Sequence, residues 1–395
     1  MSGAGSARVP LAAAVEEAVS TLRSNPELAV GVALGLVVVV VLFWLAIRRF
    51  RRTKGESFLR VLRNADEAVA VLMHPNPDPD AMACALAVKE LAGVVDTEAR
   101  MLYPGDIRHQ ENRAFQTVLD LDFEQIDRAG DIAADTVVLV DHNSPRGFVG
   151  ADNLEPRAVV DHHPGNGTGS TFTDVRMDHG SCASIFAGYF QELGWEPVGP
   201  DAEPGSDGRK ALSPGVATGL LYGIQSDTKH LTKGCSSAEF DAAGYLYRGI
   251  DQDQLDRIAN PEVDAEVLDV KARAIESREV RNAFAVSDVG KVSNVDAIPQ
   301  AADELLRLEG VTAVVVVGEH DRTLHLSGRS RDDRVHMGKT LRTAVDDVPM
   351  ADAGGHARMG GGQLSVQHMR GLGPGNGLSR EVFHDRLFDA MNGEV

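Results

Sequence analysis

Residues 158–163 read Ala-Val-Val-Asp-His-His, a short apolar run followed at once by three side chains that can bind a metal ion. An apolar run of this kind indicates a buried strand. Open α/β sheets present their chemistry at the carboxyl ends of their strands, which is where Asp161, His162 and His163 stand. Three such residues can meet by chance, so the triplet gains meaning only from similar clusters elsewhere in the chain.

Three further clusters of acidic or histidine residues each follow a strand-like run or a helix. Two of them come after the apolar runs 68–73 and 136–140, and the third ends an apolar helix expected at 214–223. A carboxylate directly after a buried strand is costly unless it is paired or metal-bound. Taken singly, each residue could instead be a turn or a helix cap. The clusters contribute His74, Asp78, Asp80, Asp141 and Asp227.

Together with His162, these clusters offer four carboxylates and two imidazoles without a thiol. Such ligation favours hard divalent ions, Mn²⁺ or Mg²⁺, over structural zinc. Two ions about 3.5–4 Å apart would clamp a phosphate and generate a hydroxide nucleophile, which is the chemistry of phosphate-ester hydrolysis.

In order and spacing, the clusters resemble the DHH phosphoesterase superfamily, in the branch that carries a C-terminal DHHA1 domain. The resemblance covers about residues 60–390. It implies hydrolysis of phosphodiesters or phosphomonoesters of short nucleotides by a centre of two Mn²⁺ ions, with Mg²⁺ as the alternative ion. Its motifs are His74-x3-Asp78-x-Asp80, Val140-Asp141-His142-Asn143, Asp161-His162-His163 and Ser226-Asp227-Thr228.

The resemblance also implies a role for each site residue. One ion would be held by His74, Asp78 and Asp141, and the other by Asp80, Asp141, His162 and Asp227, with Asp141 bridging. Asp161 would orient His162. His163 would bind the scissile phosphate or protonate the leaving oxygen, and a satisfied core histidine is the alternative interpretation.

Near residue 282 the sequence pattern changes, and a new alternation of strand-like and helical segments begins. This pattern indicates a second, smaller α/β domain, which resembles DHHA1. By that resemblance, the glycine-rich turn Ala353-Gly354-Gly355-His356 binds substrate, with Ala353 where the family has glycine. Glycines let backbone N–H groups approach an anion closely. Arg329 and Ser330 in Ser327-Gly328-Arg329-Ser330 match a strand end whose arginine contacts phosphate. A solvated surface arginine is the alternative.

The predicted fold class is therefore α/β, with a parallel-sheet catalytic domain and a smaller mixed α/β substrate-binding domain after one transmembrane helix. The predicted parts are an extracytoplasmic segment at 1–27, the transmembrane helix at 28–47, the DHH domain at 48–265, an interdomain helix at 266–282 and the DHHA1 domain at 283–395.

The membrane expectation rests on the twenty residues 28–47, which carry no charge. That length at helical rise matches a bilayer core of roughly 30 Å. Arg48, Arg49, Arg51, Arg52 and Lys54 follow at once, which predicts a single-pass protein of the cell membrane whose C-terminal part is cytoplasmic. A buried core helix is the alternative.

The composition narrows the class of substrate. A formal charge of −19 argues against extended nucleic-acid backbones. Only 8 of the 39 basic residues are lysine, and this acidic, lysine-poor surface favours a salt-adapted protein over an ordinary acidic one. We therefore expect a small cytoplasmic nucleotide as substrate, with cyclic di-AMP or pApA first and short oligoribonucleotides second. A RecJ-like exonuclease on single-stranded DNA and a non-catalytic membrane nucleotide sensor are the alternatives. A homodimer is left open.

Overall fold

The computed structural model describes residues 20, 23–50, 52–107, 109–202, 210–332, 334–371 and 377–393. Within the helix at 26–50, the side chains of residues 28, 29, 32 and 42–50 are not part of that description. The chain divides into two compact units: residues 1–74, 83–102 and 126–250, and residues 75–82, 103–125 and 251–395. Most of the predicted N-terminal segment at 1–27 lies outside the described residues.

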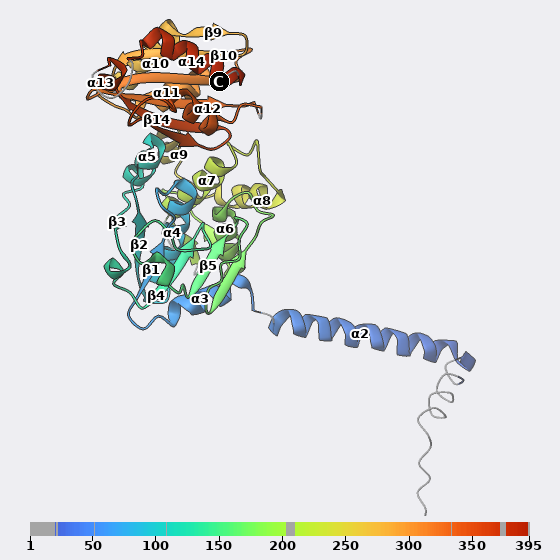
Figure 1. The fold of residues 1–395 in the computed structure, drawn as a ribbon. Helices are drawn as coiled ribbons and strands as arrows, with labels where there is room; N and C mark the ends of the chain where they lie inside the picture. The colour runs from blue at the N-terminus through green and yellow to red at the C-terminus, as the bar shows by residue number, and fades with distance from the viewer. Residues whose placement is uncertain are drawn as a thin grey trace, which may run out of the picture. The chain divides into compact units, whose positions relative to one another are not determined.

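The apolar run near the N-terminus forms helix α2 (Pro26–Phe50; Figure 1). Its described valines and leucines are exposed, with values such as 59% for Val37 and 63% for Val40. Over the described part of the chain, no helix combines the length and apolar character that crossing a membrane requires. The structure therefore gives no support to the predicted span at 28–47.

The first unit is built on a six-stranded sheet whose strands run in the order β3-β2-β1-β4-β5-β6. Strands β1, β2, β4, β5 and β6 pair in parallel, which confirms the parallel sheet expected from the alternation of strands and helices. The strands are β1 (Ala68–Leu72), β2 (Glu98–Pro104), β3 (Phe123–Ile126), β4 (Thr136–Val140), β5 (Ala158–Asp161) and β6 (Phe172–Val175).

The central strands β1 and β4 are buried along their whole length, as continuous apolar runs in a parallel sheet should be. Phe58 of the first helix after α2 is fully buried and packs its ring against Phe172, Phe186 and Tyr189. The helices before residue 260 are α3 (Lys54–Arg63), α4 (Pro79–Gly93), α5 (Gln110–Val118), α6 (Cys182–Glu192), α7 (Pro214–Asp227), α8 (Ser237–Leu246) and α9 (Gln252–Ala259). Of these, α5 and α9 lie in residues of the second unit. The short strands β7 (Trp195–Pro197) and β8 (Lys210–Leu212) pair with each other.

The second unit is built on a mixed sheet of order β13-β14-β12-β11-β10-β9. Residues of strand β11 alternate between its two faces: Val315 and Val317 pack with α12 and α14, whereas Val314 and Val316 pack with α10 and α11. The strands are β9 (Glu279–Arg281), β10 (Phe284–Lys291), β11 (Ala313–His320), β12 (Thr323–Ser330), β13 (Asp352–Gly355) and β14 (Met359–Ser365). The helices are α10 (Ala265–Ser277), α11 (Ala297–Leu305), α12 (Met337–Val345), α13 (Val366–Met369) and α14 (Arg380–Asn392).

Candidate metal centre

The predicted metal ligands stand where the strand order of the first sheet reverses. Strand β1 pairs with β2 on one side and with β4 on the other, so the chain leaves the sheet in opposite directions from β1 and β4. His74 follows β1, Asp141 follows β4, and Asp161 is the last residue of β5. Such a switch point at the carboxyl ends of parallel strands is the usual position of a ligand site in an open α/β sheet.

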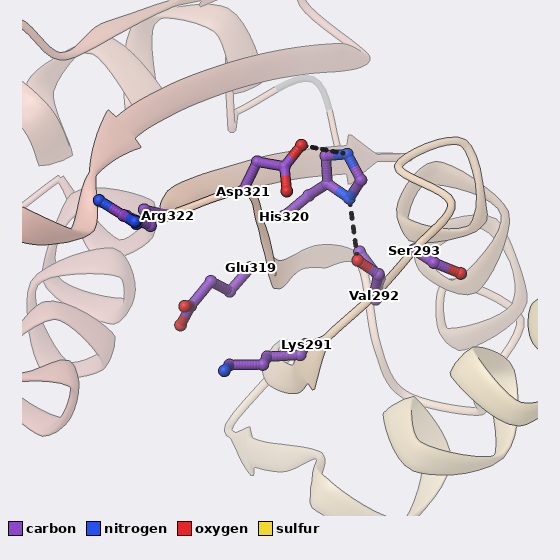
Figure 2. A pocket seen from close by; sticks show the side chains of 7 residues that line it. All are labelled: Lys291, Val292, Ser293, Glu319, His320, Asp321 and Arg322. Atoms are coloured by element: carbon purple, nitrogen blue, oxygen red, sulfur yellow. Dashed lines mark hydrogen bonds and ion pairs between the residues drawn. The ribbon is translucent and has the colours of Figure 1, made fainter.

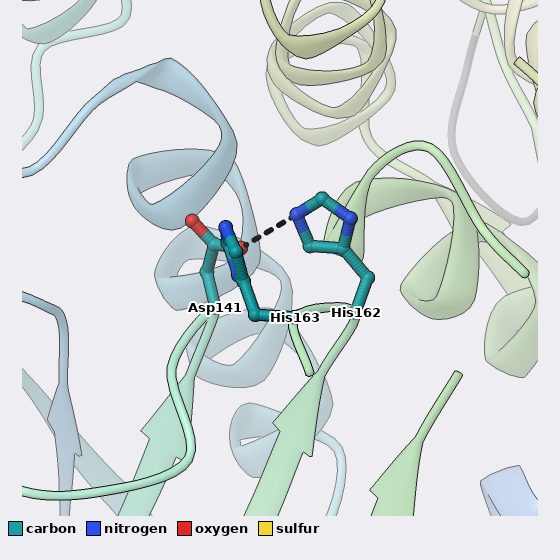
Figure 3. A group of neighbouring side chains, drawn as sticks. All are labelled: Asp141, His162 and His163. Atoms are coloured by element: carbon teal, nitrogen blue, oxygen red, sulfur yellow. Dashed lines mark ion pairs between the residues drawn. The ribbon is translucent and has the colours of Figure 1, made fainter. Parts of the chain in front are cut away.

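Asp141 is the centre of the cluster (Figure 3). Its carboxylate is 1% exposed, and Oδ1 lies 3.3 Å from His162 Nε2 while Oδ2 lies 3.4 Å from His74 Nε2. Burial acts to raise the pKa of Asp141, but the contacts with His162 and His74 outweigh it and hold that pKa below its usual value. The backbone of Asp141 has a φ of 60°, a left-handed conformation that aspartate tolerates better than most residues.

Among the described residues, the ligand atoms form compact groups that could each hold an ion. Each group has its ligand atoms within 4.8 Å of one another, and the groups are His74–Asp78–Asp141, Asp80–His162–Asp227 and Asp141–His162–His163. The first two correspond to the ligand sets implied by the resemblance, except that Asp141 is not part of the group that contains Asp80. His162 thus faces both Asp141 and Asp227, whose Oδ2 is 3.3 Å from His162 Nε2.

These spacings suit a shared cation better than direct hydrogen bonds. Two ligand atoms about 2.1 Å from one ion, at octahedral to tetrahedral angles, are roughly 3.0–3.4 Å apart. The contacts of Asp141 and Asp227 with the imidazoles are 3.3–3.4 Å, at the upper end of that range. Both carboxylate oxygens of Asp141 are buried and accept no hydrogen bond from the described residues. Buried acceptors in this state are expensive, and a divalent ion would satisfy them.

Helix α4 positions the two carboxylates of the proline-rich loop. Asp78 accepts a hydrogen bond from the backbone amide of Ala81 (3.1 Å), so it caps the helix, and Asp80 is fully buried in the first turn. The capping role considered for Asp80 therefore belongs to Asp78. Asp227 is the last residue of helix α7, which runs four residues beyond the predicted end at 223.

Asp161 contacts a different histidine ring from the one expected. Its Oδ1 lies 3.0 Å from His163 Nδ1, and it meets His162 only through the backbone amide, at 2.8 Å. The ring of His162 instead places Nδ1 3.3 Å from the carbonyl oxygen of His179. The expectation that Asp161 orients the ring of His162 is thus corrected: Asp161 orients His163.

Sequence reasoning missed two residues that support the centre. Asn143 donates from Nδ2 to Asp161 Oδ2 at 2.7 Å, which holds the second carboxylate oxygen. The loop after His163 passes very close to Asn143, because a Cβ added at Gly167 would lie 1.4 Å from the Asn143 carbonyl oxygen. The motif Asp141-His142-Asn143 could have suggested a role for Asn143. The second missed residue is His179, whose carbonyl oxygen contacts the ring of His162 and which no sequence motif marks.

His142 lies beside the centre but belongs to none of the ligand groups. Its Nδ1 contacts the carbonyl oxygen of Val140 at 2.9 Å, and the ring is 1% exposed. Burial lowers the pKa of His142 to about 4, so the ring is neutral at physiological pH.

In the second unit, Arg329 lines a cavity of about 960 Å³ together with Asp303 and Arg307. Its guanidinium is engaged by Asp303, with Nε 2.6 Å from Oδ1, and by Ser327 Oγ at 3.0 Å. Ser330 is buried, and its hydroxyl contacts the backbone of Asp332, so the side chain serves the local turn.

Most of the predicted glycine-rich turn is the end of strand β13, which contains Ala353, Gly354 and Gly355, and only His356 lies in the connection to β14. Gly355 has a φ of 137°, and a Cβ added there would lie 2.4 Å from the Met359 carbonyl oxygen, so this position requires glycine. Gly354 and His356 flank it, and the exposed His356 accepts at its carbonyl from the amide of Gly338 (3.0 Å). The replacement Ala353 fits, because its methyl group joins the core of the second unit.

Another hollow, of about 560 Å³, lies at the β11–β12 hairpin (Figure 2). His320 contacts the Val292 carbonyl oxygen (3.0 Å) and Asp321 Oδ2 (3.3 Å) there. Arg329 lies near the other end of β12, because it pairs with Val314 rather than with the hairpin residues. This hollow therefore contains none of the predicted substrate residues.

Comparison with known proteins identifies both parts of the chain. Residues 68–224 match the model of the DHH family, N-terminal domain, and residues 281–372 match that of the DHHA1 domain. The uncharacterized protein MJ1633 of Methanocaldococcus jannaschii is 35% identical over 69% of this chain and 54% of its own length. The cyclic-di-AMP phosphodiesterase GdpP of Geobacillus thermodenitrificans is 28% identical over 83% of this chain and 49% of its own length.

The chain thus spans about half the length of these two relatives. Among solved structures, an exopolyphosphatase-related protein from Bacteroides fragilis superimposes with a TM-score of 0.61 at 16% identity, over 86% of this chain and 96% of that protein. At this identity the likeness shows a shared fold.

Proposed function

Because the chain belongs to the DHH/DHHA1 family, we propose that it is a divalent-metal-dependent phosphoesterase that hydrolyses phosphodiester bonds of small nucleotides. The observation that carries this proposal is the convergence of carboxylates and imidazoles on Asp141 at the switch point of the sheet. The family match supports a hydrolase acting on phosphoester bonds, and the geometry supplies ligands for the ions that such chemistry uses.

A pair of divalent ions, when bound, would supply Lewis-acid stabilisation of the phosphate and an activated water. The remaining steps belong to the side chains. Asp141 faces both His74 and His162 and so can join the two ligand groups. The contact with Asp161 raises the pKa of the half-exposed His163, so more of this imidazole carries a proton near neutral pH. A protonated His163 can donate to the leaving oxygen.

We propose Mn²⁺ as the ion. The three groups contain oxygen and nitrogen donors only, and all three cysteines lie outside them. Carboxylate-rich ligation suits Mg²⁺ and Mn²⁺, and the imidazoles His74 and His162 favour Mn²⁺ of the two. Titration of the metal-free chain with each ion would test this order of preference.

Cyclic di-AMP or pApA is the substrate that we propose first, with short oligoribonucleotides second. One relative similar over 83% of this chain is named as a cyclic-di-AMP phosphodiesterase. The formal charge of −19 disfavours long nucleic acids, whose backbones require a basic surface. Arg329 in its cavity offers a planar cation for a single phosphate.

A turnover panel tests the proposal. The full chain would be assayed in Mn²⁺ and high salt with cyclic di-AMP, pApA, a three-nucleotide RNA, 3′-phosphoadenosine 5′-phosphate and long single-stranded DNA. We expect hydrolysis of a small nucleotide that stops on chelation, and none of the DNA. Preferred degradation of the DNA would indicate a RecJ-like exonuclease. Tight nucleotide binding without turnover would indicate a sensor and would refute the enzyme.

We also propose that helix α2 attaches the chain to the cell membrane with its C-terminal part in the cytoplasm. Support comes from the sequence, in which the uncharged run 28–47 is followed at once by basic residues. Sedimentation of membranes from cells that make the full chain, or residues 55–395 alone, is the test. Equal recovery of both in the supernatant would contradict the proposal.

A further inference from the structure

His162 has its two ring nitrogens in different surroundings. Nε2 faces Asp141 and Asp227 at 3.3 Å each, whereas Nδ1 lies 3.3 Å from the carbonyl oxygen of His179. A carbonyl oxygen can only accept, so the ring proton belongs on Nδ1 and the lone pair on Nε2. The His179 carbonyl therefore selects the tautomer that binds a metal through Nε2.

The same peptide group is held from its other side by Glu239. The amide of Gly180, which shares the peptide with the His179 carbonyl, donates to Glu239 Oε1 at 2.8 Å. A peptide whose N–H meets a carboxylate has a more negative carbonyl oxygen, because successive hydrogen bonds polarise one another. A continuous path thus runs from Glu239 through one peptide to the ring of His162.

Glu239 is more than the capping residue of helix α8. Its Oε2 completes a capping box with the amide and hydroxyl of Ser236, at 2.7 and 2.9 Å. Its Oε1 is not part of the capping box and accepts hydrogen bonds from Gly180 N and Ser184 Oγ, at 2.8 Å each. The exposed capping-box residue Glu56 of α3 shows the ordinary case, in which the carboxylate meets the amide of Thr53 at 3.3 Å. Glu239 is instead 0% exposed, with donors on both oxygens.

Close packing fixes the position of this peptide. A Cβ added at Gly180 would lie 2.2 Å from the Gly234 carbonyl oxygen and 3.1 Å from Thr228 Cγ2. Thr228 follows Asp227 directly, so the segment that presents Asp227 packs against the peptide that orients His162. The positions of Asp227 and His162 thus both depend on one junction, by which we mean the contacts of the His179–Gly180 peptide with Glu239, Thr228 and Gly234.

We propose that Glu239 is a positioning residue of the metal centre, which acts through the His179–Gly180 peptide to fix His162 Nε2 toward the ion shared with Asp80 and Asp227. This inference rests on the proposed function, since it concerns the same centre. The inference is selective, because the His179 carbonyl contacts His162, which belongs to the group with Asp80 and Asp227, whereas the group of His74, Asp78 and Asp141 does not include His162.

The test is calorimetric titration of the metal-free full chain with Mn²⁺. We expect two binding events in the wild type. In Glu239→Gln, four donors meet only one acceptor oxygen and an NH₂ group, so the junction is disturbed. One event should weaken about tenfold, the lower end of the range for groups that orient metal-bound histidines, and the other should change less than about twofold. Asp227→Asn should weaken the same event, and Asp78→Asn the other.

Ser236→Ala is the matched control, because it removes a capping hydroxyl and leaves Oε1 on Gly180. It should lower the melting temperature yet leave both events unchanged. Glu239→Asp, too short to keep both sets of contacts, provides a second variant with the selective loss expected of Glu239→Gln. Unchanged affinities in the Glu239 variants, or equal weakening of both events, would overturn the inference and leave the proposed function standing. A wild type that binds no Mn²⁺ would overturn both.

Discussion

Asp161 Oδ1 lies 3.0 Å from Nδ1 of His163, and the pKa values of the two groups shift as those of an ion pair do. The contact with Asp161 raises the pKa of His163. Burial acts to raise the pKa of Asp161, but hydrogen bonds from the His163 side chain and amide lower it overall. The carboxylate of the Asp-His-His triplet therefore contacts the ring of the exposed His163, while the carbonyl oxygen of His179 contacts the ring of His162, whose side chain is 12% exposed.

Replacing Asp161 with asparagine should impair turnover more than metal binding. The neutral asparagine cannot stabilise a proton on His163 Nδ1 as a carboxylate does. It also places an NH₂ group near the backbone amides of His162 and His163, which now donate hydrogen bonds to Asp161. We expect kcat to fall about 10- to 100-fold, up to the lower end of the roughly 100- to 10,000-fold range for general acid–base catalysis because His163 itself remains, with the affinity for Mn²⁺ changed less than about threefold. Steady-state kinetics and calorimetry measure the two quantities.

His162→Asn provides the contrast, because it should remove a ligand and weaken Mn²⁺ binding directly. If Asp161→Asn lost Mn²⁺ affinity as severely as His162→Asn, Asp161 would belong to the metal ligation and the assignment to His163 would be wrong.

Asp141 allows a test that separates backbone conformation from metal binding. Both Asp141→Asn and Asp141→Ala should lose Mn²⁺ binding at the joined groups and reduce hydrolysis to background. Asparagine tolerates the φ of 60° at this position, whereas alanine does not. Without metal, the free energy of unfolding of Asp141→Ala should therefore be about 1 kcal/mol lower than that of Asp141→Asn. Urea unfolding in the presence of a chelator gives that difference. An active Asp141→Ala enzyme would refute the two-metal centre.

The strands that carry the site could be predicted because each is a continuous apolar run that ends in polar residues. Strand β4 matches its expected bounds, and β1 and β5 differ from theirs by one residue. Strands β13 and β14 could not be found in this way, since the glycines at 354–355 and 360–362 are poor strand formers and pair only because tertiary context holds them.

The contact between Asp161 and His163 was within reach of sequence reasoning. The Asp161 carboxylate accepts from the amide of His163 and also contacts its ring, and aspartate side chains commonly make such contacts two residues along the chain in turns. By contrast, Glu239 lies 59 residues from Gly180, and no periodicity or motif links the two positions. Such long-range polar contacts depend on how α6 and α8 pack.

Replacing Arg329 and replacing Asp303 should change KM in opposite directions. Asp303 engages the guanidinium at 2.6 Å, so a substrate phosphate has to compete with that carboxylate. We expect Arg329→Ala to raise KM about tenfold with little change in kcat, as the loss of a charged hydrogen bond implies. Asp303→Asn should lower KM severalfold, because it frees the guanidinium. Steady-state kinetics in one buffer of fixed salt concentration would measure both.

Arg307→Ala is the matched control, since Arg307 lines the same cavity but makes its ion pair with Glu304. If all three variants left KM unchanged, the cavity would not be the substrate site.

The ion pair between Asp288 and Arg380 predicts a defined loss of stability in acid. Burial acts to raise the pKa of Asp288, but contacts with His384, Arg380 (2.6 Å) and the Gly290 amide lower it to about 2. A carboxyl group with a depressed pKa stabilises the fold above its unfolded value of 3.8, and this contribution disappears as the pH falls toward 2. The contribution is about 2 kcal/mol, because each pKa unit corresponds to about 1.4 kcal/mol.

Asp288→Asn should therefore unfold with less free energy than the wild type at pH 7, and the gap should close between about pH 4 and pH 2. Chemical unfolding in high salt, followed at several pH values, measures that gap. Asp321→Asn is the control, because this carboxylate is 91% exposed at a hairpin where asparagine tolerates the left-handed backbone. A gap for Asp288→Asn that stayed constant from pH 7 to pH 2 would mean that the carboxylate charge does not stabilise the second unit.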